Sequence, residues 1–126
     1  MFNRTEKGDY MAKFLEFVLE DQAYAILVDS VRKVSQLHSI FRIPQTPNYV
    51  LGVTNYGDQL ITVIYLKFLL GIPKLYFAKR QLTINVFIGN SFYALLADDV
   101  LGVIDVNLQN AKQIETLNFK FVILNK

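Results

Sequence analysis

The chain has 126 residues, of which 52% are hydrophobic and 13% aromatic, and its formal net charge is +2. It contains no cysteine and a single histidine, His38, which excludes disulfide frameworks, thiolate metal sites and any site that needs two imidazoles. This length predicts one domain, and the weak positive charge gives no reason to expect nucleic acid as a partner.

The first twelve residues, 1–12, are predicted to form a disordered leader, because no hydrophobic period begins before Lys13. The run also lacks the continuous apolar stretch of a secretory signal. The most apolar window, residues 60–73, is interrupted by Lys67 and is shorter than the roughly twenty residues that a membrane helix needs. We therefore expect a cytoplasmic protein.

The first patterned segment predicts a β-hairpin. Residues 14–19 and 23–28 are rich in aromatic and β-branched side chains, and three polar residues between them supply a turn. Residues 31–37 resume the pattern and predict a further strand. The hairpin and this strand make the beginning of the chain β-structured.

Prolines and glycines punctuate the next part of the chain. Pro44 and Pro47 force extended backbone before each of them, and Pro47 is expected to open one helical turn that ends at Gly52. Residues 55–58 have the composition of a turn. A strand over 60–64 and a short helix over 66–70 are predicted to follow.

The second half predicts strands over 82–88, 91–97, 100–106 and 119–124. Gly89 and Asn90 form a two-residue hairpin turn between the first two, and Gly102 suggests a bulge in the third. Residues 107–118 are polar and weakly patterned. Many short strands and no crossover helices predict an all-β barrel or sandwich.

No catalytic, cofactor or metal site is expected from the residue pattern. Asp98 and Asp99 are adjacent, so on a strand they face opposite sides, and they are interpreted as a solvated turn. His38 has no acidic residue within eight positions. Aromatic residues near Lys74, Lys79 and Arg80 leave a single-stranded nucleic-acid site as an alternative, although this cluster is more typical of a solvated loop.

One set of motifs resembles a known family. The run Arg42-Ile43-Pro44, Thr46-Pro47, Tyr49 and Gly52-Val53-Thr54-Asn55 resembles the CheW-like adaptor domain of bacterial chemotaxis systems. The rest of the family's pattern is also present in the family's order. The hairpin comes before this run, and the apolar segment 60–66 and the segment 97–103 come after it. The resemblance covers about residues 13–106.

The resemblance implies a single domain over residues 13–126, with two small, interleaved, SH3-like β-barrels of five strands each around a shared core. It also implies a non-enzymatic scaffold without a cofactor, which couples chemoreceptors to a histidine kinase whose regulatory domain is itself CheW-like. Contact with membrane arrays would run only through these partners. The implied receptor groove holds Val31, Lys33, Asn55, Tyr56, Gly57 and Asp58, and the implied kinase contacts are Arg42, Ile43, Pro44, Ile114 and Phe119.

The sequence departs from the family in two respects. Gly57 replaces a usual arginine and Lys33 replaces a usual acid, so an alternative is a divergent member that binds one partner only and limits array assembly. Residues 107–126 are short for the family and lack its closing helix, so we expect one strand of the second lobe to be missing or abbreviated. An apolar edge exposed in this way would be covered by a partner or by self-association.

Overall fold

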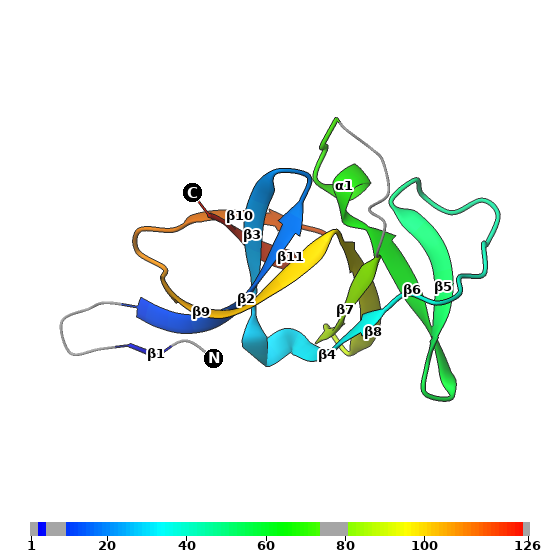
Figure 1. Cartoon of the computed structure of the whole chain (residues 1–126), viewed down its shortest axis with the longest axis horizontal. Coiled ribbons are helices and arrows are strands. Elements are labelled where there is room, and N and C mark those ends of the chain that lie inside the picture. Colours follow the sequence, from blue (N-terminus) through cyan, green and yellow to red (C-terminus); the bar gives the residue numbers. More distant parts are fainter. Residues whose placement is uncertain (1–2, 5–9, 74–80, 125–126) are drawn as a thin grey trace.

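The middle of the chain forms one β-lobe, and the two ends of the chain come together in a second one (Figure 1). The computed structural model describes residues 3–4, 10–73 and 81–124. We call the lobe from the middle of the chain the middle lobe and the lobe from the two ends the terminal lobe. The middle lobe is therefore inserted between the first and last strands of the terminal lobe, which is the interleaving expected from the sequence.

The terminal lobe is an antiparallel sheet in the order β9-β2-β3-β11-β10, with a two-residue strand, β1, beside the start of β2. One strand of this lobe was expected to be missing or abbreviated; no strand is missing, because the polar run 107–118 holds β10, a strand of five residues. Gly102 lies at the predicted bulge, where the pairing of β2 and β9 shifts register. The strands are β1 (Asn3–Arg4), β2 (Tyr10–Leu19), β3 (Gln22–Leu27), β9 (Asp99–Asn107), β10 (Lys112–Thr116) and β11 (Phe119–Leu124).

The middle lobe is a five-stranded sheet in the order β4-β7-β8-β6-β5, in which only β6 and β8 are parallel. A 3-10 turn (Val28–Ser30) leads into it, and the helix α1 (Leu66–Leu69) follows β6 as predicted. Gly89 and Asn90 both have positive φ angles in the predicted β7–β8 turn. The strands are β4 (Val31–Gln36), β5 (Val50–Tyr56), β6 (Gln59–Tyr65), β7 (Leu82–Ile88) and β8 (Ser91–Ala97).

Two expectations about local structure differ from the fold. β2 begins at Tyr10 and β1 pairs with it, so strand structure reaches into the segment expected to be a leader, whose residues 1–2 and 5–9 lie outside the described part. The helical turn expected after Pro47 is instead a tight turn, because Val50 already pairs with Ile64 in the sheet. Cross-strand pairing outweighs the weak helical preference of one turn.

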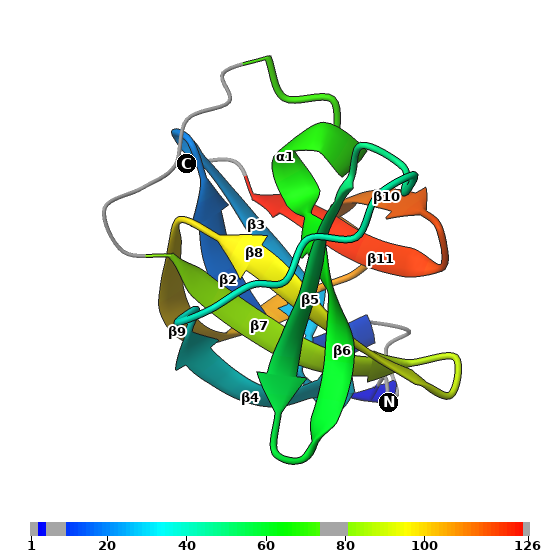
Figure 2. The same cartoon turned by 90° about the vertical axis from the view of Figure 1, so that its right-hand side faces the viewer.

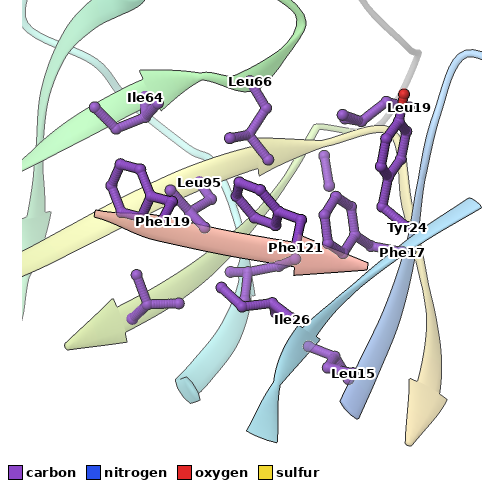
Figure 3. Packing of buried hydrophobic residues seen from close by; sticks show 13 residues of the cluster. Leu15, Phe17, Leu19, Tyr24, Ile26, Ile64, Leu66, Leu95, Phe119 and Phe121 are labelled. Carbon is purple, nitrogen blue, oxygen red and sulfur yellow. The ribbon is translucent and has the colours of Figure 1, made fainter. Parts of the chain in front are cut away.

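The two lobes bury one shared core between them, shown in Figure 3. β2 and β3 alternate, so one set of their side chains faces this core and the other set faces the interior of the terminal lobe. The middle lobe likewise has a small core of its own around Val63. The shared core contains Leu15, Phe17, Leu19, Tyr24, Ile26, Phe119 and Phe121 from the terminal lobe and Ile64, Leu66, Ile84, Val86, Leu95 and Ala97 from the middle lobe.

A buried cluster of charges also joins the lobes. Lys67 of α1 lies 2.6 Å from Glu20 Oε2 and 2.9 Å from Asp98 Oδ2, and its side chain is only 3% exposed. Asp98 Oδ2 also accepts a hydrogen bond from the backbone N–H of Glu20. The interpretation of Asp98 as part of a solvated turn was therefore wrong, because its carboxylate neutralises a buried cation.

The edges of the middle sheet are joined by the segment after β4. Figure 2 shows this segment running from the end of β4 toward β5. Phe41 exchanges two backbone hydrogen bonds with Val53, and Thr54 Oγ1 donates to the Ser39 carbonyl. The segment thus covers the outer edge of β5, which would otherwise expose unpaired backbone groups.

Gly52 allows this close approach. A Cβ atom at this position would lie 2.4 Å from the backbone oxygen of Phe41, and its φ of 152° is one that other residues rarely adopt. We expect Gly52→Ala to lower the free energy of unfolding by about 1–3 kcal/mol, measured by urea denaturation. Gly71→Ala is the control, because Gly71 has a positive φ but no atom within 4 Å of a Cβ. Equal losses in the two variants would contradict a role for the contact with Phe41.

Candidate functional site

A mostly apolar groove of about 200 Å³ lies where the two lobes meet. Ile88, at the end of β7, contributes the middle-lobe wall, and Ser30 lies at the junction between the lobes. Lys120 is the charged residue of its lining. The other lining residues belong to the terminal lobe and are Phe14, Ile26, Leu27, Gln113, Asn118, Phe121 and Val122.

Val31 is the predicted receptor residue that belongs beside this groove. It follows Ser30 directly, and its half-buried side chain packs against the shared core together with Ile88. None of the residues that line the groove was selected from the sequence. These residues share no sequence signal, because the groove is formed by segments that lie far apart in the chain.

Lys33 and Asn55 line a different, polar hollow on the middle lobe. The pairing of β4 with β7 places Lys33 opposite Asn85 and Ser35 opposite Thr83. The hollow has a volume of about 360 Å³ and lies between these strands, the segment after β4, and β5. Its lining is Lys33, Ser35, Gln36, Leu37, His38, Ser39, Thr54, Asn55, Thr83 and Asn85.

The remaining predicted receptor residues lie at the tip of the β5–β6 hairpin. Tyr56 packs its ring against Phe92, with 5.5 Å between the centroids. Gly57 and Asp58 form the exposed turn, where Gly57 has a φ of 64°. The six predicted residues therefore occupy three places: the edge of the apolar groove, the polar hollow and the hairpin tip.

The predicted kinase residues are also divided between the lobes. Arg42, Ile43 and Pro44 are exposed on the segment between β4 and β5, and Ile114 is half-buried on β10. Phe119 is only 2% exposed and packs edge-on against Tyr93, with ring centroids 5.1 Å apart. Phe119 was therefore wrongly selected as a surface residue, because its side chain belongs to the shared core.

The described residues contain no group of three or more histidine, cysteine, aspartate or glutamate side chains that would hold a metal ion. His38 lines the polar hollow, whose lining includes no carboxylate. Lys74, Lys79 and Arg80, on which a nucleic-acid site would depend, lie outside the described residues. Within residues 3–4, 10–73 and 81–124, no helix has the length and apolar character to span a membrane.

Comparison with known proteins identifies the fold. The chain is similar to the chemotaxis protein CheW of Helicobacter pylori, with 30% identity over 70 residues, which is 56% of this chain and 42% of that protein. It is 30% identical over 114 residues to the chemotaxis protein CheW of Thermotoga maritima, covering 85% of this chain and 70% of that one.

A solved structure supports the same assignment. The scaffolding protein TtCheW from Thermoanaerobacter tengcongensis superposes with a TM-score of 0.76 at 25% identity, over 90% of this chain and 89% of that one. Proteins of the CheW family are non-enzymatic scaffolds or adaptors. The family model described as the CheW-like domain matches residues 13–122, and the chain belongs to this family.

Proposed function

We propose that the chain is a cytoplasmic adaptor that couples the tip of a chemoreceptor to a chemotaxis histidine kinase by binding both. The observation that carries the proposal is the two-lobed CheW-like fold with an open apolar groove at the junction of its lobes. Binding without turnover of a small molecule is the expected activity.

The groove is the proposed receptor surface. Its lining combines apolar side chains with Ser30, Gln113, Asn118 and Lys120, which suits a partner with an apolar ridge and polar flanks. Val31 lies at its edge. Lys33 and Asn55 at the polar hollow, and Tyr56, Gly57 and Asp58 at the hairpin tip, would set the charge that a receptor meets beyond the groove.

The exposed segment after β4 is the proposed kinase surface. Phe41 is 53% exposed and Ile43 is 44% exposed, so two large apolar side chains lie near each other in the sequence beside Arg42 and Pro44. Apolar side chains with an arginine among them are typical of binding surfaces. Ile114 lies on the other lobe and would take part only if the kinase spans both lobes.

The adaptor role predicts that the two partners can be uncoupled by separate variants. Ser30→Arg adds a long charged side chain to the groove without removing any core atom, and we expect it to weaken receptor binding at least tenfold. Ile43→Asp places a charge on the exposed segment, and we expect a similar loss for the kinase regulatory domain. Each variant is titrated against a receptor-tip fragment and against the kinase domain.

Asn110→Arg is the control for Ser30→Arg, because it adds the same positive charge in an exposed turn of the terminal lobe. It is expected to bind both partners normally. Failure of the unmodified chain to bind either partner would overturn the adaptor role. Binding to the kinase alone would instead support the alternative of a divergent member that limits array assembly. That alternative was raised because Lys33 and Gly57 depart from the family's usual residues.

A further inference from the structure

The polar hollow of the middle lobe has the features of a small-molecule site. Thr83 and Asn85 form its floor and are 2% and 4% exposed. Their position on β7 is unexpected, because Ile84 and Val86 alternate with them and face the shared core. In an open sheet the opposite face would meet solvent, but here β5 and the segment after β4 close the hollow on that side.

Hydrogen bonds within the floor satisfy most of its polar atoms. Thr83 Oγ1 lies 3.0 Å from Ser35 Oγ, and Asn85 Nδ2 donates to the same Ser35 oxygen at 3.5 Å. Asn85 Oδ1 has no hydrogen-bond partner although it is buried. A buried acceptor without a partner is costly, so this atom favours a ligand that carries an N–H or O–H donor.

The rim of the hollow favours negative charge. Lys33 is exposed and forms no ion pair with any residue that the structure describes, and no carboxylate lines the hollow. Asn55 and Gln36 add amide donors at the same rim. The volume of about 360 Å³ corresponds to roughly a dozen water molecules, which is room for a small organic acid.

We propose that this hollow binds a small hydroxycarboxylic acid, with its carboxylate near Lys33 and its hydroxyl donating to Asn85 Oδ1, which the Asn85 amide turns into the hollow when the acid binds. A hydroxyl suits the floor better than an ammonium group, because a buried ammonium would be repelled by Lys33 at the rim and would lose more hydration. The site shares Lys33 and Asn55 with the proposed receptor surface, but ligand binding does not require the adaptor role.

The test compares malate with succinate, which has the same two carboxylates but no hydroxyl. We expect the purified chain to bind malate at least tenfold more tightly than succinate in isothermal titration calorimetry. Backbone amide shifts in NMR are expected to change on β4, on β7 and around residues 37–39. Equal affinity for the two acids, or no binding of either acid at about 10 mM, would overturn the proposal.

Two variants separate the floor from the rim. Asn85→Asp keeps the size of the side chain but places a carboxylate in the hollow, so binding of malate should be lost. Lys33→Gln changes an exposed residue and should weaken the binding of both acids by about tenfold or more, since it removes the cation. Lys112→Gln, on β10 of the other lobe, is the matched control and should bind malate normally. Unchanged malate affinity in both Asn85→Asp and Lys33→Gln would also overturn the proposal.

Discussion

Replacing Lys67 with methionine is expected to lower the free energy of unfolding by about 3–5 kcal/mol. Lys67 lies within 2.9 Å of both Glu20 and Asp98, and the side chains of Lys67 and Glu20 are 3% and 7% exposed. Removing the ammonium leaves two carboxylates close together without a cation. The loss is measured by urea denaturation followed by circular dichroism.

Lys13→Met is the matched control for this variant. Lys13 forms an ion pair with Asp105 at the same distance of 2.9 Å, but the two side chains are 66% and 61% exposed. Water screens such a pair, so its loss should cost less than about 1 kcal/mol. If both lysine variants lost the same stability, burial of the Lys67 cluster would not be the cause.

The protonation of Lys67 gives the same cluster a pH dependence. Burial by itself lowers the pKa of the Lys67 ammonium, but its hydrogen bonds and charge interactions with Glu20 and Asp98 outweigh burial and raise the pKa above its ordinary value of 10.5. A group whose pKa is raised by folding stabilises the fold below its unfolded pKa, and this contribution is lost as the pH rises through the folded pKa. The stability difference between the unmodified chain and Lys67→Met should therefore be constant near neutral pH and shrink above pH 10.5.

Replacing Phe121 with alanine is the second change with a large expected effect, a loss of about 3–5 kcal/mol. Phe121 is 1% exposed and its ring lies 6.0 Å from that of Phe17 and 6.2 Å from that of Phe119. Because this core is common to both lobes, the cavity should destabilise both together. NMR amide signals from β5 and from β10 should disappear at the same urea concentration.

Phe41→Ala serves as the control for Phe121→Ala, because the Phe41 side chain is 53% exposed. It should cost less than about 1 kcal/mol. Two separate transitions in Phe121→Ala, one for each lobe, would show that the lobes are stabilised independently, which would contradict the role given to the shared core.

The strands were largely predictable from the sequence because their periodicity is local. The strand over Phe119–Leu124 and those over Leu82–Ile88 and Ser91–Ala97 match the predicted ranges, since turn residues bound each of them. β10 was missed because Lys112–Thr116 has only one large apolar residue, Ile114. It is a strand because β11 pairs with it along its whole length.

The candidate sites were less predictable, because they depend on which faces the lobes cover. Thr83 and Asn85 look like the solvent face of an alternating strand, yet both are buried. Lys67 looks like an interruption of an apolar segment, and only its proximity to Glu20 and Asp98 in space reveals its role. Phe119 was selected as a kinase contact although its side chain is buried, because a resemblance to a family gives no measure of burial.

The insertion of one lobe within the other also dictates an order of assembly during synthesis. The strands β4 to β8 are consecutive in the chain, so the middle lobe can form as soon as residue 97 has been made. β2 must wait for β9, with which it pairs across about 90 residues, as in Phe14 opposite Ile104. Until then the β2–β3 hairpin has two apolar faces and only the middle lobe to cover one of them. Apolar faces of the nascent chain therefore stay exposed to aggregation until β9 to β11 have been made.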